Sequence, residues 1–303
     1  MQENNYEVII IGAGPAGISA AIYFKRAGVN PLIIEKSAPG GTLNKTSKIE
    51  NYPGYTDKDG TTLAFRMYSQ IEELGIELKI EEVVNIEESD DLFIVKTNNN
   101  EYKTKYVLIG TGKTPRKLDV KDSEKFEGKG ISYCAICDGA LYKDKDIAIV
   151  GGGNSAMEAA SYMSSIANKI YIINRSSILR ADKKEQDEVL NKENVEVLLD
   201  SKIEEIISKT DKLTGIKLST RKELNIEGIF VCIGQEPNYA YYQNSGLNTD
   251  NKGIIVDNNM KTSKDGIYAV GDAISKDLYQ VVNAVSEGAV AATCIIKEIK
   301  KGV

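Results

Sequence analysis

The chain contains no histidine among its 303 residues. This absence excludes catalytic arrangements in which an imidazole takes the proton from a serine or cysteine nucleophile. It also excludes zinc sites that require an imidazole ligand. Proton transfer must therefore use aspartate, glutamate, cysteine, tyrosine, lysine or a bound cofactor.

Cysteine is scarce as well, and four residues are too few for a secreted protein built on disulfides. Cys232 lies in an apolar run and Cys294 follows two alanines and a threonine, so we expect both to be small buried hydrophobic residues. The other two, Cys134 and Cys137, form a C-x-x-C pair that Asp138 follows directly.

Long uninterrupted hydrophobic runs are also missing. Residues 8–24 are apolar apart from Ser19, but three glycines and a proline break them, which favours a strand, a turn and a helix over a membrane span. No basic region precedes an apolar one at the start, so we expect no signal peptide. The net charge of −6 is spread along the chain, without the basic surface typical of nucleic-acid binding. We expect a cytoplasmic protein with neither a membrane nor a nucleic-acid partner.

A glycine-rich turn follows the first predicted strand, residues 6–11, and opens a helix expected over residues 18–27. A G-x-G-x-x-G turn at this place lets the backbone approach a pyrophosphate at the positive end of a helix. An acidic residue ends the next strand, 18 residues after the turn, where it can accept hydrogen bonds from the adenosine ribose. The candidate residues of this first dinucleotide site are Gly12, Gly14, Pro15, Ala16, Gly17 and Glu35.

A second turn, G-x-G-x-x-A, follows the strand 147–150 and opens a helix expected over residues 154–166. No carboxylate stands after its second strand, residues 169–173, where an acid would favour a free 2′-hydroxyl and a cation a 2′-phosphate. NADPH is therefore predicted over NADH. The candidate residues are Gly151, Gly153, Asn154, Ser155, Ala156, Asn174, Arg175 and Arg180.

The two halves repeat weakly. Each has a β-α-β unit, then short strands (75–94, expected as antiparallel hairpins, and 195–218), then a strand that ends in glycine (107–112 and 229–234). A strand over 266–270 and a final helix over 280–299 have no counterpart in the second half. We therefore predict an α/β fold of two Rossmann-like domains, of the three-layer ββα type, with the second inserted in the first. The predicted domains are residues 1–114 with 243–303, and residues 115–242.

The C-x-x-C pair lies between the two glycine turns and allows three interpretations. A zinc half-site lacks partners, because the chain has no histidine and the other cysteines lie in apolar segments. A structural disulfide is unusual in a cytoplasmic protein. A redox dithiol is favoured, and Asp138 is placed to shuttle the proton that a leaving thiolate needs. The alternative role of Asp138 is that of a helix N-cap or turn residue.

Taken together, these motifs closely resemble the low-molecular-weight thioredoxin reductases of the two-domain flavoprotein disulfide reductase group, over essentially the whole chain. The resemblance extends to Gly40-Gly41, Asn51-Tyr52-Pro53-Gly54, Thr111-Gly112, Pro115-Arg116, Ile233-Gly234, Pro237-Asn238 and residues 268–272. It implies FAD in the discontinuous domain, NADPH in the inserted one, a rotation between them, a homodimer, and thioredoxin or a thioredoxin-like protein as partner.

The resemblance also implies roles for single residues. Cys137 would lie next to the flavin, Cys134 would attack thioredoxin, and Asp138 would be the acid. The FAD contacts that it implies beyond the first glycine turn are Gly41, Thr42, Leu43, Asn51, Thr111, Gly112, Gly271, Asp272 and Gln280. The expected activity is reduction of the thioredoxin disulfide, with electrons passing from NADPH to FAD to the Cys134–Cys137 disulfide.

The chain departs from the group's pattern in three places. Asn174-Arg175-Ser176 replaces the usual His-Arg-Arg, Thr42 a glutamine, and Tyr279 an arginine. One usual cation for the 2′-phosphate is therefore missing. Rival interpretations are a dithiol oxidase that uses FAD, a thioredoxin reductase that takes electrons from ferredoxin, and a non-catalytic redox sensor. The intact turn at residues 151–156 argues against ferredoxin as donor.

Overall fold

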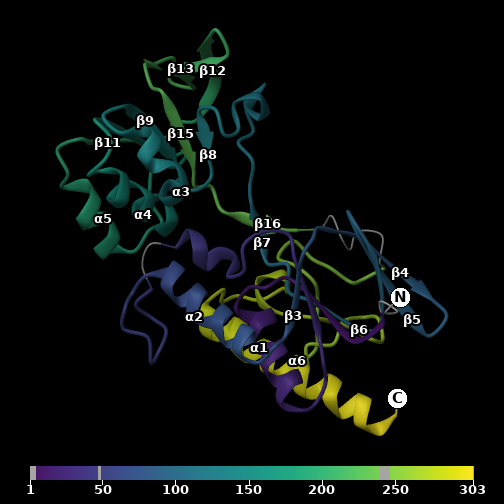
Figure 1. Ribbon diagram of the computed structural model, residues 1–303. Helices are drawn as coiled ribbons and strands as arrows, with labels where there is room; N and C mark the ends of the chain where they lie inside the picture. The colour runs from purple at the N-terminus through teal and green to yellow at the C-terminus, as the bar shows by residue number, and fades with distance from the viewer. Residues whose placement is uncertain (1–4, 47–48, 239–245, 303) are drawn as a thin grey trace. The chain divides into compact units, whose positions relative to one another are not determined.

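The computed structural model describes residues 5–46, 49–238 and 246–302, and the chain divides into two compact units (Figure 1). The first unit is Met1–Thr114 with Glu236–Val303, and the second is Pro115–Gln235. The first change of unit falls between residues 114 and 115. The second falls between 235 and 236, whereas the sequence placed it between 242 and 243, within residues 239–245, which lie outside the described part.

The first unit is built on a mixed sheet in the order β3-β2-β1-β6-β5-β4, with β17 also paired to β6. Strands β1, β2, β3, β6 and β17 pair in parallel, and β4, β5 and β6 pair antiparallel. The strand bounds are β1 Asn5–Ile11, β2 Leu32–Glu35, β3 Glu77–Ile80, β4 Val83–Ser89, β5 Leu92–Thr97, β6 Glu101–Ile109 and β17 Ile267–Ala269.

One expectation about this sheet was wrong. Residues 75–94 are not hairpins throughout, because β3 is a parallel strand at the sheet edge beside β2. Only the part from β4 onward forms an antiparallel hairpin, with β5.

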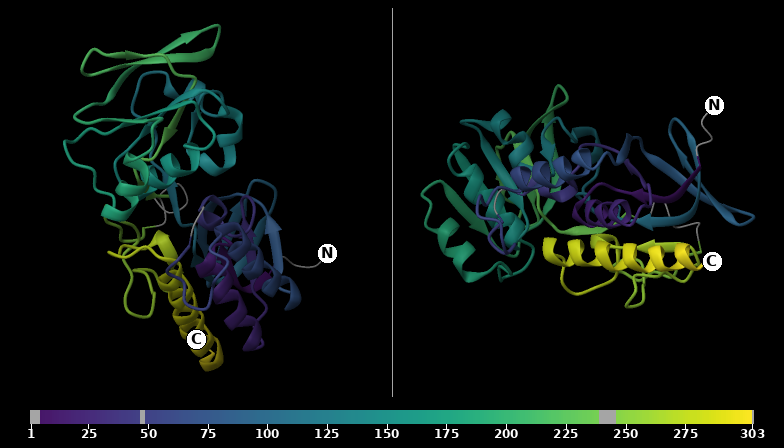
Figure 2. Two further views of the ribbon diagram at one scale, coloured as in Figure 1. Left: turned by 90° about the vertical axis from the view of Figure 1, so that its left-hand side faces the viewer. Right: turned by 60° about the horizontal axis from the view of Figure 1, so that its bottom comes forward.

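Alternating side chains of the central strands pack into two hydrophobic cores, one on each face of the sheet. Val8 and Ile10 of β1 pack with the helices on one face, and Ile9 and Ile11 pack on the opposite face. This period of two is the pattern of a strand buried on both faces. Figure 2 shows helices α1 and α6 lying side by side in this unit. The helices are α1 Pro15–Arg26, α2 Gly60–Glu73 and α6 Val281–Lys301, with 3₁₀ turns η1 Gly41–Lys45 and η5 Gly271–Ala273.

Local signals explain where these helices begin and end. Pro15 occupies the first turn of α1, where its missing N–H costs nothing, and Lys25 and Arg26 favour the negative end of the helix. The Asp59 carboxylate caps α2 by accepting from the Thr62 N–H at 2.6 Å.

The second unit contains a fully parallel sheet in the order β11-β10-β9-β15-β8 and a separate antiparallel sheet, β12-β13-β14. Ile147 and Ile149 of β9 face the helices, and Ala148 faces the antiparallel sheet, so this unit has three layers. Its strands are β8 Ile131–Ser132, β9 Asp146–Val150, β10 Lys169–Ile173, β11 Val195–Leu198, β12 Ile203–Lys209, β13 Lys212–Leu218, β14 Glu223–Leu224 and β15 Gly228–Val231. Its helices are α3 Ala135–Asp138, α4 Asn154–Met163 and α5 Lys183–Leu190, with 3₁₀ turns η2 Ser123–Phe126 and η3 Gly139–Tyr142.

The chain passes from one unit to the other in two short segments, and these segments pair as strands. Strands β7 Lys113–Pro115 and β16 Gln235–Pro237 form a two-stranded sheet. Among the described residues, no helix is both long enough and apolar enough to cross a membrane.

Candidate active site

The first glycine turn lies where the parallel strands of the first unit end. Gly12 follows β1 with a φ of +106°, and its N–H donates to the Ile34 carbonyl oxygen at 2.8 Å. A side chain at Gly12 would collide with the Gly110 carbonyl oxygen, beyond the end of β6. Glycine is required here because the backbone is left-handed and two strand ends approach closely. Gly14 is the N-cap of α1, while Pro15, Ala16 and Gly17 form its first turn.

Glu35 ends β2 and is buried, with 8% of its surface exposed. Its Oε2 accepts from the Ala13 N–H at 2.8 Å, and its Oε1 accepts from the Ser37 N–H at 3.0 Å. The carboxylate therefore holds the glycine turn against the end of β2. The Ser37 hydroxyl also donates to Oε1, at 3.3 Å. Because a carboxylate can accept about four hydrogen bonds, one acceptor site remains, on Oε2, for a ribose hydroxyl.

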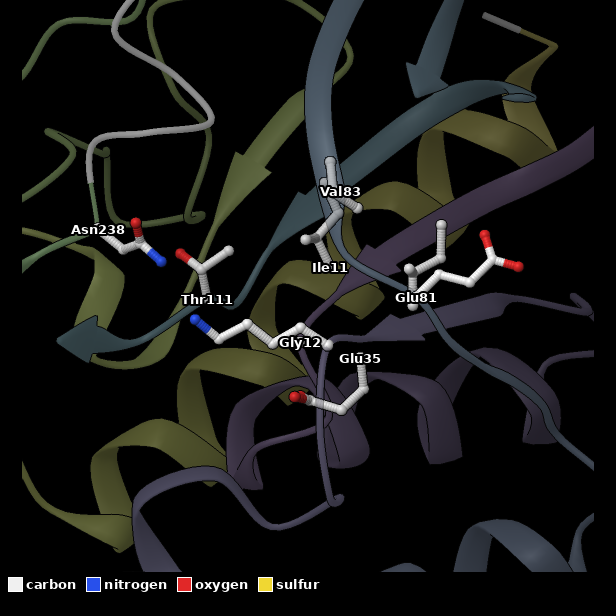
Figure 3. A pocket seen from close by; sticks show the side chains of 9 residues that line it. Ile11, Gly12, Glu35, Glu81, Val83, Thr111 and Asn238 are labelled. Atoms are coloured by element: carbon white, nitrogen blue, oxygen red, sulfur yellow. The ribbon is translucent and has the colours of Figure 1, made fainter. Parts of the chain in front are cut away.

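A pocket opens between these strand ends (Figure 3). The Thr111 hydroxyl oxygen at its wall is buried and has no hydrogen-bond partner among the residues that the structure describes. Because buried polar atoms are normally hydrogen-bonded, this unpaired hydroxyl indicates that a polar ligand in the pocket supplies its partner. The sequence did not assign Lys36, Glu81, Val83 and Asn238 to the site, although they line the pocket beside Gly12, Glu35 and Thr111.

Two further predicted segments reach the same glycine turn. The Gly40 N–H donates to the Ala13 carbonyl oxygen at 2.8 Å, and Gly41 lies next to Gly14. In the turn η1 that follows, Leu43 is buried and Thr42 is exposed. Gly112, with a φ of +65°, follows β6 beside Thr111.

Asn51 and Gln280 meet although 229 residues separate them, since the Asn51 Nδ2 donates to the Gln280 Oε1 at 2.8 Å. Gln280 is the residue that precedes α6. No local pattern pairs these two side chains, and only the fold brings them together.

Asp272 follows Gly271 in the turn η5 and is half-buried. Burial raises the pKa of its carboxyl, and the positive charges of Lys276 and Lys113 oppose that rise. Glu287 of α6 holds the turn, because its Oε2 accepts from the Gly271 N–H at 2.9 Å and from the Lys276 Nζ at 2.7 Å. The sequence missed Lys276 and Glu287, since their connection to Gly271 is tertiary.

Tyr279 stands where the resemblance predicts an arginine, and a cation is nevertheless present beside it. The Lys113 Nζ lies 3.4 Å from the centre of the Tyr279 ring, and the Lys276 Nζ lies 5.5 Å from it. An ammonium group over an aromatic face is attracted by the ring electrons. Lys113 of β7 thus brings a positive charge to this place.

In the second unit the predicted turn follows β9. Gly151 has a φ of +140°, and a side chain there would collide with the Cys232 carbonyl oxygen beyond β15. Gly153 is the N-cap of α4, Ser155 is exposed and Ala156 is buried. Asn154 exchanges two hydrogen bonds of 2.8 Å with Asp182, which is the N-cap of α5.

The predicted phosphate ligands lie beyond the end of β10. Arg175 and Arg180 are exposed, whereas Asn174 is buried with 7% exposure. The Arg180 N–H donates to the Gly152 carbonyl oxygen at 2.6 Å, so this loop is tied to the glycine turn.

The dithiol follows β8 of the same parallel sheet. It therefore lies at the carboxyl ends of the parallel strands, where the glycine turn that follows β9 also lies. Cys134 and Cys137 form a disulfide, with Cys137 exposed and Cys134 half-buried. Cys134 is the N-cap of the short helix α3, and its Sγ accepts from the Cys137 N–H at 3.2 Å. Contacts between α3 and α4 anchor the dithiol on the helix that the glycine turn opens.

Asp138 is the last residue of α3 and also the N-cap of the 3₁₀ turn η3, although its side chain makes no capping hydrogen bond there. The Ser132 hydroxyl donates to its Oδ2 at 2.6 Å and accepts from the Cys134 N–H at 3.0 Å. Ser132, which the sequence did not single out, thereby links the Asp138 carboxylate to the backbone of Cys134. Among the described residues, no three cysteine, aspartate or glutamate side chains are grouped to hold a metal ion.

Comparison of the sequence with models of known protein families identifies the family of this chain. A family model described as "Pyridine nucleotide-disulphide oxidoreductase" matches residues 6–288. The chain belongs to this family.

Several known proteins match the chain over nearly its whole length. It is 40% identical over 306 residues to a 34.2 kDa protein in the rubredoxin operon of Clostridium pasteurianum, covering 98% of both chains. It is 36% identical to a thioredoxin reductase of Listeria monocytogenes, covering 99% of this chain and 97% of that one. The crystal structure of Lactococcus lactis thioredoxin reductase superposes with a TM-score of 0.92 at 36% identity, covering 98% of this chain and 99% of that one. The resemblance seen in the sequence is confirmed, and so is the two-domain Rossmann-like fold class.

The two other cysteines of this oxidoreductase are free and only half-buried, each packed at the margin of a core. For Cys232, burial and, to a smaller extent, the charge of Glu158 raise the thiol pKa to about 12. At pH 8 its thiolate fraction is therefore on the order of one in ten thousand.

We expect iodoacetamide at pH 8 to alkylate Cys134 and Cys137 in the reduced native protein and to leave Cys232 unmodified over the same time. Peptide mass spectrometry measures the modification at each site. A urea-unfolded sample is the control, in which Cys232 should react like the others. Rapid native alkylation of Cys232 would contradict its assignment as an inert packing residue.

Proposed function

We propose that this chain is a thioredoxin-disulfide reductase that uses FAD and NADPH. The proposal rests on the Cys134–Cys137 disulfide, which lies at the same carboxyl ends of the parallel strands as the glycine turn at Gly151. The first unit carries a second turn of this kind at Gly12. A dithiol and two dinucleotide turns in one chain are the parts that electron transfer from a nicotinamide to a protein disulfide needs.

The first unit would hold FAD through the turn at Gly12, the Glu35 carboxylate and the orphan Thr111 hydroxyl. When bound, FAD supplies the redox chemistry that links a hydride donor to a disulfide. The backbone N–H groups that open α1 would face its pyrophosphate. Asp272, Gln280 and Asn51 are the polar groups proposed for the rest of the cofactor.

The second unit would hold NADPH. The helix α4, which begins at Asn154, would face the pyrophosphate, and the exposed Arg175 and Arg180 would bind the 2′-phosphate. Lys183, a candidate to replace the missing cation, pairs with Asp187 at 2.7 Å.

Thioredoxin would be reduced by thiol–disulfide exchange. The Cys134 thiolate attacks one sulfur of the partner's disulfide, and the other sulfur leaves as a thiolate. Cys137 then attacks the Cys134 sulfur, which re-forms the internal disulfide and releases the partner as a dithiol. Asp138, held by Ser132, would give a proton to a departing thiolate.

The proposal is tested by anaerobic titration of the purified yellow protein. We expect about one FAD per chain and bleaching of its absorbance that is complete only after about two equivalents of NADPH, because the Cys134–Cys137 disulfide and the flavin each take one electron pair. The absorbance should recover when oxidised thioredoxin is added. Oxygen consumption on a small dithiol, without thioredoxin turnover, would instead indicate a dithiol oxidase. Bleaching by reduced ferredoxin but not by NADPH would indicate a ferredoxin-dependent reductase.

Coenzyme preference gives a second test, because the chain has Ser176 where relatives usually have a cation. A hydrogen bond from a cation to phosphate contributes about 1.5–3 kcal/mol, which corresponds to roughly tenfold to hundredfold in affinity. We expect NADPH to be preferred over NADH by a modest margin and Ser176→Arg to widen it, mainly by lowering the KM for NADPH in steady-state kinetics.

Ser165→Arg is the matched control, because it adds the same charge at an exposed position before β10, at the opposite end of that strand. It should leave the ratio of the two kcat/KM values unchanged. A higher kcat/KM for NADH in the unaltered protein would refute the assignment of Arg175 and Arg180.

We also propose that the protein works as a homodimer in the cytoplasm. Exposed apolar side chains of the first unit, Phe65 on α2 and Tyr23 on α1 among them, are compatible with an interface between copies. Light scattering after gel filtration should give twice the chain mass of 33.2 kDa.

A further inference from the structure

Asn174 is a polar side chain in a buried position, at the residue after β10. Its backbone continues the sheet, because its N–H donates to the Leu198 carbonyl oxygen at 2.9 Å and its carbonyl accepts from the Ser201 N–H at 3.0 Å. The side chain is therefore fixed at its root, and a buried amide must find partners.

The donors of this side chain are used within its own loop. The Nδ2 lies 2.9 Å from the Ser176 carbonyl oxygen, 3.0 Å from the Ser176 Oγ and 3.0 Å from the Ile178 carbonyl oxygen. An amide has two N–H groups, so these three acceptors account for both of them. Neither N–H is left to donate to a ligand.

The acceptor side of the same amide lies against the glycine turn. A Cβ added at Gly152 would lie 2.6 Å from the Asn174 Oδ1, so the two residues are already in contact. The Gly152 carbonyl oxygen in turn accepts from the Arg180 N–H at 2.6 Å and from the Ala181 N–H at 3.0 Å. The loop is held to the glycine turn at both of its ends, at Asn174 and at Arg180.

We propose that Asn174 is a positioning residue that sets the specificity for a 2′-phosphate. It closes residues 174–178 into a compact loop against Gly152, so that the exposed Arg175 and Arg180 converge on one anion. This inference rests on the proposed use of NADPH and changes the role of Asn174 from a coenzyme contact to a support for the two arginines.

A selective defect follows from this arrangement. Removing the Asn174 amide leaves the Ser176 carbonyl with only the Asp200 N–H at 3.4 Å and the Ile178 carbonyl with only the Ser176 hydroxyl at 3.0 Å. Neither of these bonds ties the loop to Asn174, so Arg175 can move. The bonds to the Gly152 carbonyl come from backbone N–H groups, so the glycine turn keeps them. Recognition of the 2′-phosphate should therefore fall while binding of the rest of the nucleotide stays.

The test is calorimetric titration of the FAD-loaded protein with adenosine 2′,5′-bisphosphate and, separately, with adenosine 5′-monophosphate. Losing one cation contact to phosphate corresponds to roughly tenfold to hundredfold in affinity. We expect Asn174→Ala to weaken the bisphosphate by about this factor and to change the monophosphate by less than about threefold. Asn174→Ser keeps one hydrogen-bond donor, so its affinity for the bisphosphate should lie between those of the unaltered protein and the alanine variant. The same variant can replace Asn174→Ala in the test if the alanine variant does not fold.

Asn194→Ala is the matched control. Asn194 also has a partly buried amide that donates to two carbonyl oxygens, those of Ser164 at 3.0 Å and Ala167 at 3.1 Å. It precedes β11, however, and so lies at the amino ends of the parallel strands, whereas Asn174 lies at their carboxyl ends. It should lower thermal stability without changing the ratio of the two affinities. Equal weakening of both ligands by Asn174→Ala, or an unchanged ratio, overturns the inference. If the unaltered protein itself shows no preference for the bisphosphate, the proposed coenzyme is wrong, which is a separate failure.

Discussion

Replacing either Cys134 or Cys137 by serine should abolish NADPH-dependent reduction of thioredoxin, a loss of at least about a thousandfold, because a serine hydroxyl cannot form the disulfide bonds of the exchange. The two sulfurs are joined in the structure, and α3 keeps them on one turn of backbone. The assay follows thioredoxin thiols with a chromogenic disulfide. Cys294→Ser, which removes a free cysteine outside the dithiol, is the control and should retain turnover.

The two serine variants should differ from each other in a second measurement. The partner for this measurement is a thioredoxin that lacks its resolving cysteine and carries an aromatic thiol in disulfide linkage on the remaining one. If Cys134 attacks the partner, Cys137→Ser should displace the aromatic thiolate and hold this thioredoxin as a covalent complex on non-reducing gels. Cys134→Ser should not trap it, but its remaining Cys137 thiolate should perturb the flavin absorbance at high pH. The reverse pattern would exchange the two assignments, and turnover by both variants would refute the dithiol mechanism.

Gly14→Val should give a folded protein without FAD. Gly14 has extended backbone, with φ −76° and ψ 179°, and a Cβ added there meets no atom of the described residues within 4 Å, so valine fits the fold. The same side chain would stand where the backbone must approach a pyrophosphate. Flavin absorbance per chain should fall to background, while circular dichroism keeps the helical signal.

Gly153→Val is the matched variant in the second unit. Gly153 is also an N-cap with extended backbone, and within the described part of the chain a Cβ added there likewise meets nothing within 4 Å. This variant should keep its yellow colour and lose reduction by NADPH. Normal FAD content in Gly14→Val, or loss of FAD in Gly153→Val, would show that the two turns have been assigned to the wrong cofactors.

The sequence alone determined the parts whose signals are local. Each glycine turn is one apolar run, a short glycine pattern and one amphipathic helix, and all three patterns are visible within a single segment of the sequence. The helices accordingly lie where expected, with ends displaced by a few residues: α1 is Pro15–Arg26, α4 is Asn154–Met163 and α6 is Val281–Lys301. The spacing of Cys134 and Cys137 was equally local, because two cysteines three residues apart can close a disulfide over one turn.

Only the tertiary structure decided the features that depend on distant partners. β3 joins the sheet in parallel because β2 offers it an open edge, and a four-residue strand carries no signal of its partner's direction. Asn51 meets Gln280, and Glu287 reaches Gly271, because α6 returns to the edge of the first sheet. Asn174 was predicted as a coenzyme contact, yet its amide lies buried among acceptors of its own loop. Residue type and spacing identify which side chains can carry the chemistry, but the direction and the remaining hydrogen-bonding capacity of each depend on neighbours that only the fold supplies.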